Sequence, residues 1–138
     1  MSADSQWDVQ TSLYTTLSSD ATLTALLANG AGSVLDYIEE DTSFPYVVIS
    51  DSKTKPFDTQ LGYGVDMTVS IHSWSRYKGL KETKQIMSAI YDALHDMDLV
   101  IPNQTTILSY FESSENKLGK DGITRHGIQK FRIVTEPV

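Results

Sequence analysis

The sequence predicts an α+β fold, with a mostly antiparallel sheet and helices packed on one of its faces. Three patterns lead to this expectation. Apolar residues recur at steps of three and four near the start and again from Leu80 to Met97, which is typical of amphipathic helices. Val65 to Ile71 alternate apolar and polar residues, as in a strand with one buried face. Two later segments rich in β-formers are separated by Asp121-Gly122, a strong hairpin-turn pair.

The composition is that of a globular protein, and we expect a single domain spanning residues 1–138. The apolar fraction of 40% and the charged fraction of 21% are ordinary, and no segment approaches the roughly 20 apolar residues that span a bilayer. The first residues lack the basic and apolar regions of a secretory signal, so we expect synthesis in the cytoplasm. The sequence has no cysteine, which excludes disulfides, thiolate metal sites and a cysteine nucleophile.

The net charge of -7 argues against a nucleic-acid-binding protein of the usual kind. Such proteins neutralise phosphates with clustered Lys and Arg side chains, whereas the 11 basic residues of this chain are scattered along the sequence.

The first part of the chain predicts two helices followed by strands. The helical pattern from Trp7 to Ala28 is interrupted at Ser18-Ser19-Asp20, where the second serine or the aspartate would cap a second, short helix. Asn29-Gly30 is suited to end that helix. Val34 to Tyr37 is a candidate short strand, and Tyr46 to Ser50 has the composition of a buried strand.

The segment from Asp51 to Gly64 is expected to be a loop or hairpin tip, because it is rich in turn-forming residues. It nevertheless contains three apolar side chains, Phe57, Leu61 and Tyr63. Long loops in small domains are usually functional or disordered, and apolar residues argue against disorder. We therefore expect an arm that reaches the adjacent subunit or ring; the alternative is that these side chains fold back onto their own sheet.

The second part of the chain predicts a helix and two paired strands. The helix covers Leu80 to Met97, and the strands cover Thr105 to Ser113 and Thr124 to Thr135. The strands should pair antiparallel, with the ladder ending before their connection. The first of them carries apolar groups on both faces, which favours cover by a neighbouring subunit and hence oligomerisation.

No motif predicts a catalytic, cofactor-binding or metal site. His72, His95 and His126 lie far apart without metal-ligand spacing, and we expect each to be structural or solvated. No nucleophile elbow, P-loop or dinucleotide-binding glycine motif occurs, and the grouped carboxylates are expected at the surface. A small hydrolase would require His72, His126 and a carboxylate to converge.

The sequence Trp74-Ser75-Arg76-Tyr77, between the strongest strand and the strongest helix, allows two interpretations. It is either an exposed aromatic and arginine cluster of the kind enriched at interface hot spots, or Trp74 closes the core while Ser75 or a neighbour caps the helix. The candidate interface residues are therefore Phe57, Leu61, Tyr63, Trp74, Arg76 and Tyr77.

The block from His72 to Gly79, continued by Lys81-Glu82 and Ile90 to His95, resembles the tail completion proteins, or tail terminators, of siphophages, prophages and gene transfer agents. Further similarities occur in the same order along nearly the whole chain. They are Leu26-Leu27, Phe44 to Ile49, Phe111-Glu112, Gly122 to Gly127 and Phe131-Arg132.

The resemblance implies a structural virion protein without catalysis or cofactor. Such a protein forms a ring, usually of six copies, on the last ring of the tail tube, stops tube growth and provides the surface that docks to the head or connector. The implied partners are further copies of the chain, the tail tube protein and the head-tail connector protein, with no membrane. The implied place is the head-proximal end of the tail.

DNA would pass through the lumen of such a ring without specific binding, and acidic side chains facing the lumen would keep it from sticking. The alternative function is that of a head-tail connector or another tail-associated adaptor subunit, and a small hydrolase is much less favoured.

Overall fold

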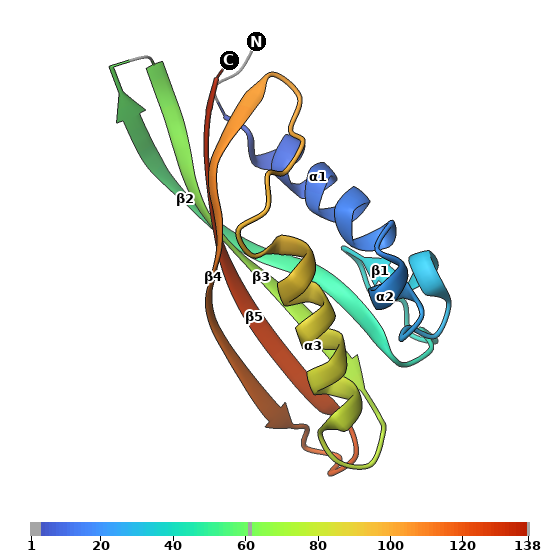
Figure 1. Ribbon diagram of the computed structural model, residues 1–138. Coiled ribbons are helices and arrows are strands. Elements are labelled where there is room, and N and C mark those ends of the chain that lie inside the picture. Colours follow the sequence, from blue (N-terminus) through green and yellow to red (C-terminus); the bar gives the residue numbers. More distant parts are fainter. Residues whose placement is uncertain (1–3, 61, 138) are drawn as a thin grey trace.

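The computed structural model describes residues 4–60 and 62–137 (Figure 1). Three helices and a short 3-10 turn accompany five strands, in an order that intermixes helices and strands along the chain. The elements are α1 (Gln6–Ser18), α2 (Ala21–Thr24), η1 (Gly30–Ser33), β1 (Val34–Leu35), β2 (Tyr46–Thr59), β3 (Gly62–Ser75), α3 (Lys81–Leu94), β4 (Gln104–Leu118) and β5 (Arg125–Pro137).

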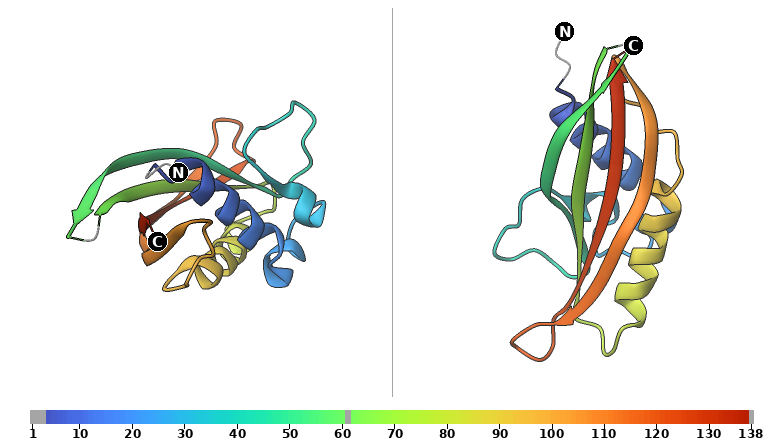
Figure 2. Two further views of the ribbon diagram at one scale, coloured as in Figure 1. Left: turned by 90° about the horizontal axis from the view of Figure 1, so that it is seen from above. Right: turned by 90° about the vertical axis from the view of Figure 1, so that its left-hand side faces the viewer.

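The strands form one sheet in the order β1-β2-β3-β5-β4. Only β1 pairs in parallel, with β2, while the β2–β3, β3–β5 and β5–β4 pairs are all antiparallel. The helices lie on one side of this sheet and leave the other side, here called the outer face, without a helical layer (Figure 2). The predicted α+β class and the one-sided packing are confirmed.

The hydrophobic core lies between the helices and the inner face of the sheet. Ile86, Ile90 and Leu94 of α3 are fully buried, at the four-residue spacing that placed them on one helical face. Each such side chain contributes about 1.5–3 kcal/mol relative to full exposure. The fully buried residues that oppose or flank them are Leu13, Leu17, Leu23, Val47, Ile71, Phe131 and Ile133. Among the described residues, the helices are too short or too polar to cross a membrane.

The helix boundaries follow local chemistry. Asp20 caps α2 as expected, because its Oδ1 accepts a hydrogen bond of 2.9 Å from the backbone N–H of Leu23. The helix α3 ends at Leu94 rather than Met97, since His95 is extended and Asp96 has a positive φ of 55°. The backbone N–H of Asp96 instead donates to the carbonyl of Ser109, 2.6 Å away, which ties the chain to β4.

The expected loop from Asp51 to Gly64 is instead a long hairpin. Continuous pairing runs from Lys55↔Asp66 to Thr59↔Gly62, so the backbone groups of this polar segment are satisfied by β3. The turn-forming residues of the segment favoured a loop in the sequence analysis, although the segment belongs to the paired strands β2 and β3. Beyond Val65, which still pairs with β5, β2 and β3 continue as a two-stranded arm that projects from one end of the molecule (Figure 1).

The β4–β5 ladder also continues further than expected, to the pair Leu118↔Arg125 beside the connection. The connection is shaped by Asp121, whose Oδ1 accepts hydrogen bonds of 2.9 Å from the N–H groups of Ile123 and Thr124. Its Oδ2 accepts a bond of 2.6 Å from the Thr124 hydroxyl, and these bonds to Thr124 hold the pKa of Asp121 at about 2. Gly122 adopts a φ of 72°, as the Asp-Gly pair predicted for this turn.

Close packing of α3 on β5 depends on Gly127. A Cβ added there would lie 2.5 Å from Met87 Sδ and 2.9 Å from Thr83 Cγ2, both on the helix. We expect Gly127→Ala to lower the free energy of unfolding by about 1–3 kcal/mol through overpacking. Met87→Ala removes the sulfur atom that the new Cβ would meet, so the double variant Gly127→Ala/Met87→Ala should recover part of the lost free energy of unfolding. Urea unfolding of the parent, the two single variants and the double variant should therefore give a favourable coupling free energy. Additive losses from the two substitutions would contradict this contact.

Candidate interaction surface

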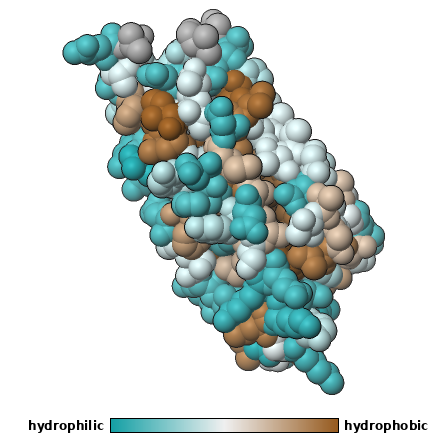
Figure 3. Space-filling model, viewed as in Figure 1, coloured by the Kyte–Doolittle hydropathy of each residue, from teal (hydrophilic) through white to brown (hydrophobic). Residues whose placement is uncertain are grey.

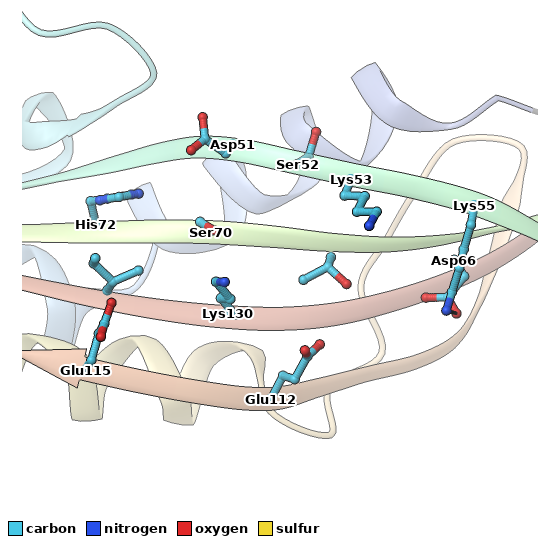
Figure 4. Close-up of a pocket in the computed structure, with 12 residues that line it drawn as sticks. Asp51, Ser52, Lys53, Lys55, Asp66, Ser70, His72, Glu112, Glu115 and Lys130 are labelled. Atoms are coloured by element: carbon cyan, nitrogen blue, oxygen red, sulfur yellow. Dashed lines mark ion pairs between the residues drawn. The ribbon is translucent and has the colours of Figure 1, made fainter.

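A groove of about 580 Å³ runs along the outer face of the sheet (Figure 4). It is lined mainly by polar and charged side chains from all four long strands, because alternate residues of each strand point to this face. The lining residues are Asp51, Ser52, Lys53, Lys55, Asp66, Thr68, Ser70, His72, Glu112, Glu115, Ile128 and Lys130.

Asp66 is the buried charge of this face, with only 4% of its side chain exposed. Arg132 on the adjacent strand β5 binds both of its carboxylate oxygens, with Nη2 at 2.7 Å from Oδ2 and Nε at 3.0 Å from Oδ1. The hydrogen bond from Arg132 outweighs the effect of burial and lowers the pKa of Asp66. Lys55 Nζ lies 4.0 Å from the same carboxylate. The carboxylate is therefore a structural anchor that joins β2, β3 and β5.

Aromatic rings form a continuous stack at the end of the outer face away from the hairpin arm. Trp74 lies 3.8 Å from the ring of His126 with an interplanar angle of 7°, and 6.4 Å from the ring of Tyr46. Phe44 extends the stack at 5.0 Å from Tyr46, and the Arg76 guanidinium lies 4.3 Å above the Phe44 ring. Cation–π contact and stacking therefore hold the segment before β2 against the ends of β3 and β5.

The structure brings together two histidines that are distant in sequence. His72 Nδ1 and His126 Nε2 are 2.6 Å apart, which is a hydrogen bond that requires at least one neutral ring. Burial lowers the pKa of His72, and burial followed by repulsion from His72 lowers the pKa of His126 to about 4. His72 Nε2 is itself buried and has no partner among the described residues, so a proton there would be poorly solvated.

Two carboxylates lie near this pair, because Asp51 acts on the charge of His72, Glu115 acts on that of His126, and both line the same groove as His72. Among residues 4–60 and 62–137, no three His, Asp or Glu side chains are grouped so that they could hold a metal ion. His95 lies elsewhere, where its Nδ1 accepts a hydrogen bond of 3.1 Å from the backbone N–H of Phe111 and joins α3 to β4. The three histidines thus have structural contacts, and the outer face is a candidate interaction surface.

The candidate interface residues fall into two groups at opposite ends of β3. On the arm, Tyr63 is 71% exposed, whereas Phe57 is half-buried and packs against Gly64. At the other end, Tyr77 is 51% exposed and Arg76 is exposed. Leu61 lies outside the described residues.

The structure contradicts the interpretation in which Trp74 closes the core and Ser75 or a neighbour caps the helix. Trp74 is half-buried, but it packs in the outer aromatic stack and not in the core beneath the helices. Ser75 does not cap α3, whose N-cap is Leu80 without a side-chain bond. The Ser75 hydroxyl instead donates to Glu82 Oε1 at 2.7 Å and accepts from the N–H of Tyr77 at 3.1 Å.

Sequence reasoning missed the charged groove and the histidine pair. Polar alternation along Asp66, Thr68, Ser70 and His72 indicated a polar face, but not its neighbours. The contact between His72 and His126 depends on the β3–β5 register, which pairs His72 with Ile128 and places His126 diagonally beside it. On the side shown in Figure 3, hydrophobic side chains form separate groups among hydrophilic ones, so no single large apolar patch marks a partner site.

Comparison with known proteins identifies the class of this molecule. The family model for tail completion protein gp17 matches residues 11–136. The tail completion protein gp17 of Bacillus phage SPP1 is 31% identical over 94 residues, which cover 68% of this chain and 69% of that protein. A chain in the structure of the virion of a native gene transfer agent particle has the same fold, with a TM-score of 0.86 and 22% identity over 98% of this chain and 99% of that one.

The protein is therefore a structural component associated with phage tails, and it is found in the virion particle. The chain belongs to the tail completion protein gp17 family, which is not a family of enzymes.

The histidine pair predicts a specific pH dependence of stability. The folded-state pKa of His126 is about 4, below its ordinary value of 6.5, so the unfolded chain binds the proton more readily. Stability should therefore be full above about pH 6.5 and fall as the pH decreases towards 4. His126→Phe keeps an aromatic ring on Trp74 but cannot titrate, and should show a smaller loss between pH 6.5 and 5 in urea unfolding. Parallel curves for the two proteins in this range would refute the assignment.

Proposed function

We propose that this protein is a tail terminator. Copies of the chain form a ring, with six as the expected number, on the last ring of the tail tube, stop its growth and present the docking surface for the head or connector. Membership of the tail completion family supports this role. The proposal needs no catalytic group, since every step consists of binding between proteins.

The observation that carries the proposal is the difference between the two ends of one long sheet. The hairpin arm projects from one end, and the loops that follow β3 and β4 form the other (Figure 1). A protein that joins two different partners requires two different contact surfaces, one toward the tube and one toward the connector. The exposed Tyr63 on the arm and the exposed Arg76 and Tyr77 at the opposite end belong to residue types enriched in interface hot spots.

The role can be tested on particles that lack this chain, imaged by electron microscopy. A terminator controls both tube length and joining, so its absence should give tubes of uncontrolled length and heads without tails. A connector or another adaptor would control joining only. Tails of normal length beside unattached heads would therefore contradict the terminator and support the alternative adaptor role.

Ring formation should depend on salt or on a template. Six chains of net charge -7 carry -42 in total (6 × -7), and this self-repulsion disfavours a free ring at low ionic strength. Light scattering should show mainly monomers or small oligomers at low salt. Added salt or tubes should shift the population to rings of about 92 kDa (6 × 15.4 kDa). A ring that is stable at low salt and dissociates as salt increases would contradict this argument.

The arm should act between molecules. Tyr63→Ser removes an exposed side chain, so the melting temperature of the free subunit should change by no more than about 1 °C. If Tyr63 is an interface hot spot, the loss of about 2 kcal/mol would weaken tube binding roughly 30-fold. Phe57→Ser should also weaken binding, but with a loss of melting temperature, because Phe57 is half-buried against Gly64.

Val100→Ser provides the control for the arm substitutions, since Val100 is 86% exposed and lies outside the arm. This variant should bind tubes as the parent chain does. Equal binding by Tyr63→Ser and the parent chain would show that Tyr63 is not part of the contact.

A further inference from the structure

The sheet has two unpaired edges, one on each side of the molecule. On one side, β1 covers β2 only through the pairs Val34↔Val47 and Leu35↔Val48, so among the described residues the remainder of the β2 edge has no strand beside it. On the other side, β4 is the last strand of the sheet and pairs only with β5. Unpaired edges readily template pairing with another chain.

The topology makes these edges complementary in direction. The successive β2–β3, β3–β5 and β5–β4 pairs are all antiparallel, so β4 runs opposite to β2. If identical copies are related by rotation about an axis along the strands, β4 of one copy lies antiparallel to β2 of the next. Such a head-to-tail contact repeats at every interface and closes into a ring. We propose that copies of this chain join laterally by pairing the β2 edge of one with the β4 edge of its neighbour, an inference that rests on the proposed ring.

Pro56 sets the end of the shared ladder. Proline within a sheet is confined to positions where its missing N–H would face away from the existing ladder. Since backbone groups alternate in direction along a strand, Thr54 presents its N–H outward as Pro56 would. The new ladder can therefore use residues 52–55, which are exposed and follow the bulge between Ile49 and Ser52, and it cannot continue through Pro56. The tip of the arm remains free for contact with another ring.

Charge complementarity supports a copy of the same chain as the occupant of this edge. On the outer face, Lys53 and Lys55 lie on β2, while Glu112 and Glu115 lie on β4 (Figure 4). Among the described residues, neither Lys53 nor Glu112 takes part in an ion pair within the chain. Lysines on an edge strand usually prevent pairing with other chains. Here the two glutamates on the opposite edge would select the correct partner for these lysines, since ion pairs between proteins contribute more to specificity than to affinity.

The register is consistent with this pairing. The ladders place Lys53 level with Tyr110 through Thr68 and Arg132, and Glu112 follows on β4 at the register shift between Phe111 and Ser113. A sheet that closes on itself requires its strands to be staggered. A stagger of about two residues brings Glu112 of one copy beside Lys53 of the next, and both side chains line the outer face of the sheet.

A second contact can form on the helical side of the sheet. A groove of about 370 Å³ lies beside the β2 edge, lined by Trp7 and Tyr14 of α1 together with Ile49. Trp7 is 70% exposed and Tyr14 is 45% exposed. Beside the β4 edge, Tyr91 and Ile107 are 37% and 42% exposed. Burial of these apolar side chains between neighbours would add the hydrophobic contribution that exposed ion pairs lack.

A charge exchange between two variants tests the pairing directly. Lys53→Glu places a carboxylate opposite Glu112 of the neighbour, and Glu112→Lys places an ammonium group opposite Lys53. Each variant alone should therefore form at least tenfold fewer rings than the parent chain under conditions where the parent assembles. An equimolar mixture should restore rings, because every interface in an alternating ring is again complementary. Since Lys53 and Glu112 are exposed, both variants should keep the melting temperature of the parent. Absence of rescue in the mixture would overturn the proposal.

A backbone test is independent of charge. Thr54→Pro removes an outward N–H from the β2 edge and should abolish rings, whereas Thr54→Ala should assemble normally. Circular dichroism and melting temperature establish that both variants fold. Normal rings from Thr54→Pro would overturn edge pairing while leaving the terminator role intact. Absence of rings from the parent chain, even with tubes present, would instead refute the proposed ring and this inference with it.

Discussion

Helical cover on only one face of the sheet is the constraint on which the rest of this structure depends. The fully buried Ile86, Ile90 and Leu94 of α3, with Leu13 and Leu17 of α1, cover the inner face, whereas no helix lies on the outer face in the described part of the chain (Figure 2). A chain of 138 residues has a limited supply of apolar side chains, and most of the buried ones lie in the core beneath the helices. The outer face and both edges therefore remain accessible as polar strands, open edges and projecting loops.

The outer face is nevertheless ordered by specific polar and aromatic contacts. Asp66 accepts two hydrogen bonds from Arg132, and the pKa of this carboxyl group is lowered, so it remains charged at neutral pH. At the opposite end of the same face, Trp74 and His126 are stacked 3.8 Å apart. These two contacts fix side chains on adjacent strands without a helical layer above them, because each partner satisfies its neighbour within the sheet. These contacts order the side chains within one chain, which in the proposed role would reduce the entropy lost on association.

The sequence predicted those features that depend on local periodicity. The alternation from Val65 to Ile71 and the four-residue spacing of Ile86, Ile90 and Leu94 located a strand and a helix, and Asp20 and Asp121-Gly122 marked a cap and a turn. The hairpin arm was missed as a strand because its polar residues are held by backbone pairing with β3, which leaves no periodic apolar signal. The contact of His72 with His126 was missed because it arises from strand register between distant segments. Local patterns thus predicted the elements, whereas the site depends on long-range pairing.

In the proposed ring, the same features that permit assembly also restrain it. Open edges are an aggregation hazard, and Lys53, Lys55 and Pro56 on β2 are residue types that natural proteins use to limit edge pairing. A net charge of -7 further separates free copies in solution. Premature rings would remove subunits from the end of a growing tube, so weak lateral contacts are an advantage if the tube supplies the remaining binding energy. Each copy held on the tube raises the effective concentration of the next edge, and closure then adds the last interface without a further loss of translational freedom. A net acidic chain whose β2 edge carries lysines and a proline is therefore suited to a protein that must assemble at one place, on one template.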